Sequence, residues 1–256
     1  MLPLEAFLRK IKILGIIFRA FCFKKSELDT SMKFTLMYKF RRLFSYVLKQ
    51  KGYYWHYKNF IEQKDLSILS IYQVLKENIK NTQNDILDFG CGVGYITHFL
   101  GATGVDADKG AIKTAKKLYP KQKFHLVSSI NALKKLGKFK AVTCINVVEH
   151  LFDDDREKLF KTLPYLLKPK GKIFFVYDDM YHPLQIIAAL KKPGTLLLDP
   201  THIYCWTENQ FRRLLEKDFI VEKEVGGNIQ LATLPWGNRF ETARLYVCSP
   251  KNKTKS

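Results

Sequence analysis

The spacing of apolar residues changes near residue 85, from a helical pattern to short buried runs. Before this point, residues 1–50 and about 62–80 are predicted to be helical. After it, apolar runs predict strands over 86–89, 103–106, 124–128, 141–146, 173–177, 219–224 and 244–248. The segments between them predict helices over 95–100, 110–118, 153–167 and 208–217. Strands that alternate with helices at this spacing predict an α/β domain with a doubly wound, mostly parallel sheet.

This pattern divides the 256-residue chain into three parts. We expect residues 1–52 to form a basic amphipathic helical extension, residues 53–250 the main domain and residues 251–256 a Lys-rich tail. Within the main domain, residues 179–205 are less regular, and we interpret them as an insertion or lid. With 46% apolar residues, a chain of this length can bury a core, which excludes wholesale disorder.

The net charge of the chain predicts an anionic binding partner. The chain has 43 Lys and Arg against 24 Asp and Glu, a formal net charge of +19. Such an excess indicates nucleic acid, an acidic membrane surface or a phosphorylated substrate. In residues 1–50, an apolar face with a cationic rim is typical of a helix that lies on an anionic membrane. The alternative is a helical cap whose apolar face packs on the main domain.

The cysteines and the apolar segments favour a cytoplasmic protein. Five widely spaced Cys without a C-x-x-C pair argue against a disulfide framework or a structural zinc site. The longest apolar candidate, residues 11–23, contains Lys12 and Arg19 and is shorter than the ~20 residues that span a bilayer. We expect the protein to be cytoplasmic, and residues 1–50 could place it in peripheral contact with a membrane. We expect no metal site, since the acidic run 153–155 suits a helix start.

The segment with the clearest chemistry is the glycine-rich run 88–94 (DFGCGVG), which lies between a predicted strand and a predicted helix. Ligands bind at this carboxyl edge in open α/β sheets, and glycines let a ligand approach the backbone closely. Asp88 precedes the loop, where a carboxylate would hold a cationic amino-acid group. Asp106 ends the second strand and is suited to a bidentate grip on ribose hydroxyls. The loop lacks the final x-x-Gly spacing of the dinucleotide fingerprint.

Here the sequence resembles the class I S-adenosylmethionine-dependent methyltransferases, in their small-molecule and glycan-cluster branch. Residues 86–94 match the first motif of that family, and residues 104–106 (GVD) match its ribose-binding strand end. Weaker matches follow in the same order at 146–151 (NVVEHL), 167–172 (LKPKGK) and 199–202 (DPTH). The resemblance covers roughly residues 53–250, so it implies that this part is a Rossmann-like methyltransferase domain.

The resemblance implies that S-adenosyl-L-methionine is the cofactor. It assigns cofactor contacts to nine residues: Asp88, Gly90, Cys91, Gly92, Gly94, Asp106, Ala107, Ser129 and Asn146. The chain departs from the family after the third strand. An acidic residue near the adenine amine is common there, and this chain has Ser128 and Ser129 instead, which puts that contact in doubt.

Two histidines and a glutamate are the catalytic candidates. An oxygen nucleophile benefits from a base, and His150 or His202 could serve, with Glu149 as an orienting or basic partner. In the alternative interpretation, Glu149 and His150 cap a helix and shape the cofactor pocket, and His202 packs in the lid.

These features predict a methyltransferase that acts on a hydroxyl or carboxylate of a small-molecule, glycan or lipid-linked acceptor at or near a membrane surface. Two alternatives stay open. The first is an RNA methyltransferase, which the net charge supports; nucleic acid is the less favoured partner because no RNA-binding module is visible. The second is a non-catalytic module that binds S-adenosylmethionine.

Overall fold

The computed structural model describes residues 70–82, 85–179, 202–227 and 243–251. The expected helical extension 1–52, the Lys-rich tail beyond residue 251 and most of the expected lid at 179–205 lie outside the described residues.

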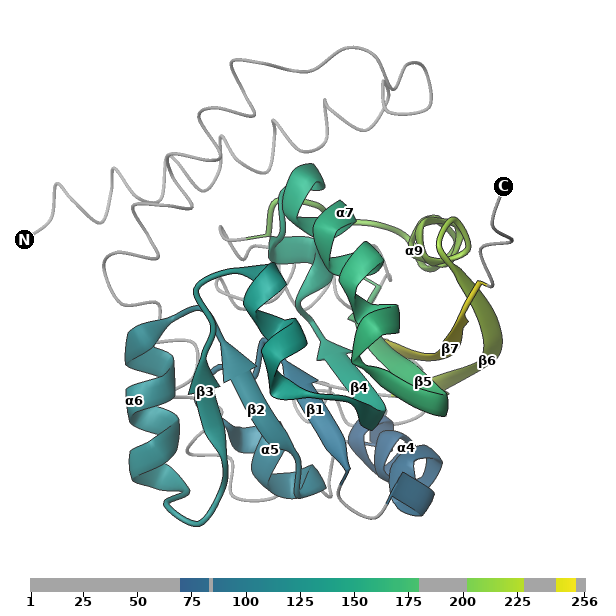
Figure 1. Cartoon of the computed structure of the whole chain (residues 1–256). Helices are drawn as coiled ribbons and strands as arrows, with labels where there is room; N and C mark the ends of the chain where they lie inside the picture. The colour runs from purple at the N-terminus through teal and green to yellow at the C-terminus, as the bar shows by residue number, and fades with distance from the viewer. Residues whose placement is uncertain (1–69, 83–84, 180–201, 228–242, 252–256) are drawn as a thin grey trace, which may run out of the picture.

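A seven-stranded sheet forms the centre of the described part, in the order β3-β2-β1-β4-β5-β7-β6 (Figure 1). The first five strands pair in parallel, and β7 pairs antiparallel with both β5 and β6. The strands are β1 (Ile86–Phe89), β2 (Thr103–Asp106), β3 (Phe124–Leu126), β4 (Phe139–Ile145), β5 (Leu167–Asp178), β6 (Phe219–Gly227) and β7 (Ala243–Pro250). The expected α/β fold with a mostly parallel sheet is confirmed.

Helices cover both faces of this sheet (Figure 1). The α-helices are α4 (Ser70–Ile79), α5 (Tyr95–Leu100), α6 (Lys109–Leu118), α7 (Asp153–Thr162) and α9 (Glu208–Leu215). The short 3₁₀ helices are η2 (Lys80–Thr82), η3 (Ile130–Leu136), η4 (Val148–His150) and η5 (Leu163–Leu166). Among the described helices, none is long and apolar enough to cross a bilayer.

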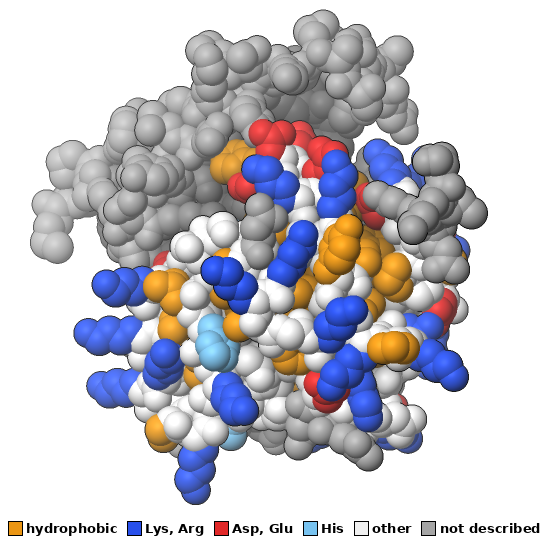
Figure 2. Space-filling view, in the orientation of Figure 1, with side chains coloured by type: hydrophobic (Ala, Val, Ile, Leu, Met, Phe, Trp, Pro, Cys, Tyr) orange, Lys and Arg blue, Asp and Glu red, His pale blue; other side chains and the backbone are white. Residues whose placement is uncertain are grey.

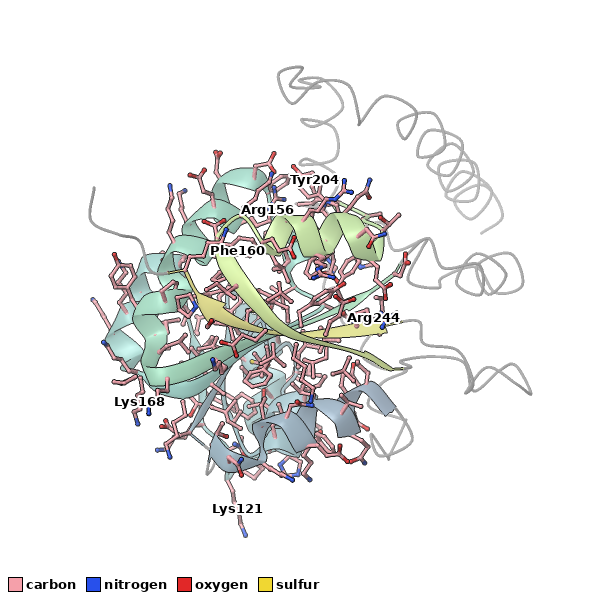
Figure 3. The ribbon with its side chains drawn as sticks, turned by 90° about the vertical axis from the view of Figure 1, so that its right-hand side faces the viewer. Lys121, Arg156, Phe160, Lys168, Tyr204 and Arg244 are labelled. Carbon is pink, nitrogen blue, oxygen red and sulfur yellow. The ribbon has the colours of Figure 1, made fainter. Side chains whose placement is uncertain are left out.

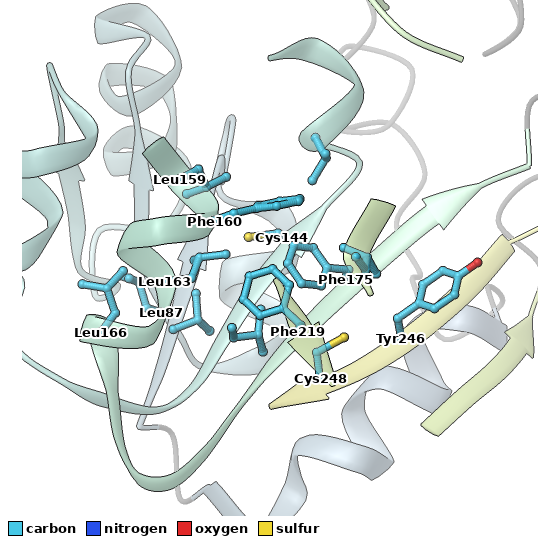
Figure 4. Packing of buried hydrophobic residues seen from close by; sticks show 14 of the residues in the cluster. Leu87, Cys144, Leu159, Phe160, Leu163, Leu166, Phe175, Phe219, Tyr246 and Cys248 are labelled. Atoms are coloured by element: carbon cyan, nitrogen blue, oxygen red, sulfur yellow. The ribbon is translucent and has the colours of Figure 1, made fainter. Parts of the chain in front are cut away.

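Three apolar clusters hold the described helices to the sheet, and the smallest, Ile112, Ala115 and Phe124, packs α6 against β3. One packs α4 and α5 against one face, with Ile71, Leu75 and Leu100 in its centre. The larger one packs α7, η5 and α9 against the other face. In it, Phe160, Phe175 and Phe219 meet edge to face or tilted, with ring centroids 5.2–5.8 Å apart (Figure 4). Aromatic pairs prefer these offset geometries to a face-to-face sandwich.

The structure differs from the sequence-based prediction at the end of α7. The helix expected over 153–167 ends at Thr162, and a 3₁₀ turn follows that contains Pro164. Proline has no backbone N–H to continue the α-helical bonding, so the chain tightens there. The strand expected over 173–177 begins earlier, because residues 167–172 already belong to β5. Lys170 keeps a left-handed φ of 63°, and the register between β4 and β5 shifts nearby.

Candidate active site

A cavity of about 460 Å³ opens where the carboxyl ends of the parallel strands meet. It lies beside β1 and β4, where the strand order reverses, and open α/β sheets bind ligands at such a switch point. The segments after four strands line it, with Phe89, Gly90 and Gly92 after β1, Asp106, Ala107 and Asp108 after β2, residues 127–130 after β3, and Asn146, Val147, His150 and Leu151 after β4.

Close packing explains the glycines of the loop after β1. Gly94 is the N-cap of α5 and has a φ of 83°, which residues with a side chain rarely adopt. A Cβ on Gly94 would lie 2.4 Å from the ring of Phe124. A Cβ on Gly90 would lie 2.5 Å from Val147. The loop is therefore pressed against β3 and the segment after β4, and the backbone of Gly92 borders the cavity.

Asp106 holds the glycine loop and faces the cavity. One carboxylate oxygen accepts a hydrogen bond from the backbone N–H of Gly92 at 2.8 Å, and the other accepts one from Asp108 at 2.8 Å. Burial raises the pKa of the Asp106 carboxyl, and these backbone hydrogen bonds oppose that shift. Each carboxylate oxygen can accept a further bond, so the pair can still receive two neighbouring hydroxyl groups.

Asp88 lies beneath the loop rather than in the cavity wall. Its side chain is buried, and its two oxygens accept hydrogen bonds from Thr97 at 2.6 Å and Thr143 at 2.7 Å. Burial raises its pKa to about 6. Asp88, Cys91 and Gly94 are not among the described residues that line the cavity. The other six predicted residues do line it.

A buried amide and a buried carboxyl lie together at the ends of β4 and β5. Asn146, with a left-handed φ of 51°, lines the cavity and donates from Nδ2 to Asp178 at 3.2 Å. The Oδ1 atoms of both residues are buried without a hydrogen-bond partner in the described structure. Burial raises the pKa of Asp178 to about 8.

The three catalytic candidates come together at the wall of the cavity. His150 lines it, and its ring centroid lies 4.7 Å from that of His202. One potential ligand atom from each of Glu149, His150 and His202 lies within 4.8 Å of the other two. The backbone carbonyl of Glu149 accepts hydrogen bonds from Ile203 and Tyr204, so η4 and the segment before α9 are tied together.

Aromatic residues that sequence analysis missed fix that same segment. The hydroxyl of Tyr177 accepts a bond from the N–H of Trp206 at 2.7 Å and donates to the Trp206 carbonyl at 2.9 Å. The guanidinium of Arg156 lies 4.7 Å from the Tyr204 ring and 5.5 Å from the Trp206 ring (Figure 3). Thr207 then begins α9 with a capping box to Gln210. The chain that follows His202 is therefore held by contacts with η4, β5 and α7.

The residues present fit S-adenosylmethionine. The carboxylate of Asp106 offers acceptors for ribose hydroxyls, and Gly92 leaves room for close approach. The buried Oδ1 of Asn146 offers an acceptor for an ammonium group. Val127 and Ile130 provide apolar walls for a flat base, beside Ser129.

Comparison with known proteins gives the same class. Residues 60–218 match a family model described as a methyltransferase domain, which is more than half of the chain. The chain therefore belongs to this family of class I S-adenosylmethionine-dependent methyltransferases. It is an enzyme of the methyltransferase class with S-adenosylmethionine as its cofactor, as the sequence motifs predict.

Named relatives come from bacteria. The chain is 27% identical over 163 residues to "Ubiquinone biosynthesis O-methyltransferase" of Coxiella burnetii (strain Dugway 5J108-111), covering 56% of this chain and 69% of the relative. It is 33% identical over 179 residues to the protein of the same name from Xanthomonas oryzae pv. oryzae (strain PXO99A), covering 60% and 68%.

Solved structures agree on the fold. A S-adenosylmethionine-dependent methyltransferase from Clostridium acetobutylicum ATCC 824 superposes with a TM-score of 0.53 at 17% identity, covering 78% of this chain and 98% of the other. A SAM-dependent methyltransferase from Anabaena variabilis ATCC 29413 gives a TM-score of 0.54 at 19% identity, covering 80% and 95%.

Proposed function

We propose that this methyltransferase acts on a hydroxyl oxygen of a small-molecule acceptor. The observation that carries the proposal is the cluster of Glu149, His150 and His202 at the cavity wall. An alcohol or phenol is a weak nucleophile until its proton is removed, and imidazole is the side chain best matched to that task near neutral pH. The names of the relatives, which are O-methyltransferases, support oxygen as the attacked atom.

The roles of the residues follow from their places. When bound, S-adenosylmethionine supplies a methyl group activated by its sulfonium. Asp106 and Gly92 would bind the ribose of the cofactor, and Asn146 would bind its amino-acid part. The acceptor would enter beside His150, which would take up the hydroxyl proton, and the ring of His202 lies next to it with a centroid distance of 4.7 Å. Most of the acceleration would come from alignment of the oxygen with the methyl carbon and from exclusion of water.

Methyl transfer to hydroxyl compounds tests this function. We expect the full chain to transfer labelled methyl groups to members of a panel of small phenols and alcohols. His150→Ala and His202→Ala should each lower kcat by roughly 10²–10⁴-fold, the range that a general base contributes. Calorimetry should show that both variants retain S-adenosylhomocysteine affinity within a few-fold.

His125→Ala is the matched control, because His125 is exposed on β3 and lies outside the cavity wall. It should leave kcat unchanged. If His150→Ala and His202→Ala both keep the wild-type kcat, neither histidine is the proton acceptor. Affinity for S-adenosylhomocysteine without transfer to any hydroxyl, carboxylate or RNA acceptor would favour the non-catalytic alternative.

We also propose that the acceptor is lipid-linked and that the enzyme works at an anionic membrane surface. Basic residues support this idea in two places. Residues 1–60 hold 13 Lys and Arg against three acidic residues, and residues 109–148 hold ten Lys and no Asp or Glu. Within the second stretch, α6 displays its lysines on the outside of the molecule (Figure 2). Leu118 and Leu126 are also exposed there, at 40% and 48%.

Removal of residues 1–50 should lower binding to phosphatidylglycerol-containing vesicles at least several-fold, because each basic residue near an anionic surface contributes about 1 kcal/mol. Cofactor affinity should stay nearly intact. Neutral phosphatidylcholine vesicles are the control. Steeply salt-dependent RNA binding with no vesicle binding would contradict the membrane proposal and favour an RNA partner.

A further inference from the structure

Two buried oxygen atoms at the ends of the neighbouring strands β4 and β5 have no hydrogen-bond partner in the described part of the chain. They are Oδ1 of Asn146 and Oδ1 of Asp178. The two strand ends are tied together, because the backbone N–H of Asn146 donates to the carbonyl of Val176 at 3.0 Å. A buried polar atom without a partner is costly, so this pair of acceptors suits a ligand that brings N–H donors.

The side-chain hydrogen bond between the two residues decides which end of the Asn146 amide is left for a ligand. An amide has a donor end and an acceptor end. Nδ2 of Asn146 donates to Oδ2 of Asp178 at 3.2 Å, so the acceptor Oδ1 is the end that stays unused, on a residue that lines the cavity. An ammonium group has three N–H donors and no acceptor, which makes it the complement of this end.

The groups around Asp178 are neutral or acidic. Asp178 is fully buried, and burial raises its pKa to about 8, although the hydrogen bond from Asn146 opposes that shift. The neighbouring Asp179 adds to the rise. Tyr72 on α4 lies near both Asp178 and Asp88, and burial raises the pKa of its phenol, so it is uncharged. Without a ligand, Asp178 therefore holds a proton at neutral pH.

No cation is present among the described groups that act on the pKa of Asp178. On β7, the residue paired with it is Ala243, and the guanidinium of the next residue, Arg244, forms an ion pair with Glu208. An opposite charge within about 4–6 Å favours the ionised form of a carboxyl group. The ammonium group of S-adenosylmethionine, bound to Oδ1 of Asn146, would supply that charge.

We propose that Asp178 is a positioning residue for the amino-acid part of the cofactor. It orients the amide of Asn146 toward the ammonium group, and it releases its proton to solvent when that group binds. The proposal rests on the place that the proposed function gives to the amino-acid part beside Asn146, and it is independent of the acceptor. Because protonation of Asp178 and cofactor binding oppose each other, cofactor affinity rises with pH and levels off above about pH 8.

Calorimetric titration of the full chain with S-adenosylhomocysteine tests this coupling. Repeated at neutral pH in buffers of different ionisation enthalpy, it counts the protons that binding releases. We expect the wild-type chain to release about half a proton to one proton more than Asp178→Asn, which keeps the shape of the side chain but cannot ionise. As pH rises from about 6 to about 8, the affinity of the wild-type chain should gain at least several-fold on that of Asp178→Asn.

Two controls isolate the ammonium group and the carboxyl group. Methylthioadenosine keeps the nucleoside and the sulfur but lacks the amino-acid part, so the wild-type chain and Asp178→Asn should release the same number of protons when they bind it. Asp155→Asn removes an exposed carboxylate that lines the same cavity from α7, and it should leave the proton count for S-adenosylhomocysteine unchanged. The comparison of the two ligands on the wild-type chain does not depend on the folding of any variant.

Equal proton release by the wild-type chain and Asp178→Asn would overturn the proposal. Equal release by the wild-type chain on binding S-adenosylhomocysteine and methylthioadenosine would also overturn it, because the ammonium group would then have no part in the release.

Failure of this role and failure of the proposed function give different results, since no acceptor is present in the titrations. If a hydroxyl acceptor is methylated but proton release does not depend on Asp178, the role of Asp178 fails and the proposed function stands. If release depends on Asp178 but no hydroxyl acceptor is methylated, the proposed function fails and the role of Asp178 stands.

Discussion

Asp106→Ala is expected to bind S-adenosylmethionine and S-adenosylhomocysteine at least about 100-fold more weakly than the wild-type chain. The substitution removes two charged acceptors for ribose hydroxyls, and hydrogen bonds to charged groups each contribute about 1.5–3 kcal/mol. It also frees the N–H groups of Gly92 and Asp108, which the carboxylate now holds at 2.8 Å. Isothermal titration measures the affinity directly.

Asp155→Asn is the matched control for this loss. Asp155 is an exposed carboxylate on the same cavity, and its ion pair is with Lys158 on the surface of α7. Its substitution should change affinity by less than a few-fold. Equal affinity of Asp106→Ala and the wild-type chain would show that Asp106 does not hold the ribose.

Gly94→Ala is expected to lower the free energy of unfolding by about 2–6 kcal/mol. A left-handed backbone costs a side-chain-bearing residue about 1–3 kcal/mol, and overpacking adds about the same amount. Both penalties apply here, because φ is 83° and the new Cβ would lie 2.4 Å from Phe124. Denaturant unfolding of the two chains gives the difference.

Gly137→Ala separates the two penalties. Gly137 has a φ of 94°, but a Cβ there would meet nothing within 4 Å. We therefore expect Gly137→Ala to lose only the backbone part, about 1–3 kcal/mol. A loss of no more than about 3 kcal/mol in Gly94→Ala would show that contact with Phe124 does not explain the glycine at position 94.

The sequence predicted the fold and the meeting of the glycine loop with Asp106 at one sheet edge, because both depend on local patterns. Short apolar runs that end in glycine or aspartate mark strand ends, and parallel strands bring those ends to one edge. Gly92 and Asp106 belong to two adjacent strand ends, so their meeting could be expected from the order of elements alone.

Contacts between distant segments could not be predicted in this way. Asp88 was expected to face the ligand, but its oxygens bond to Thr97 and to Thr143, which is 55 positions away. No local pattern indicates that a threonine on β4 will point at that carboxylate. Local patterns indicate His150 and His202 separately, and their closeness depends on the hydrogen bonds from Ile203 and Tyr204 to the Glu149 carbonyl.

Two buried carboxyl groups at the carboxyl edge of the sheet make the stability of the fold depend on pH. Asp178 and Asp88 have pKa values of about 8 and 6, raised mainly by burial above the unfolded value of about 4. Between the unfolded and the folded pKa of each group, the folded chain binds more protons than the unfolded chain, so stability falls as pH rises through that range. The contribution of Asp88 is lost by about pH 6 and that of Asp178 by about pH 8. At neutral pH, Asp178 is mostly uncharged, so this edge carries less negative charge than its carboxyl groups suggest.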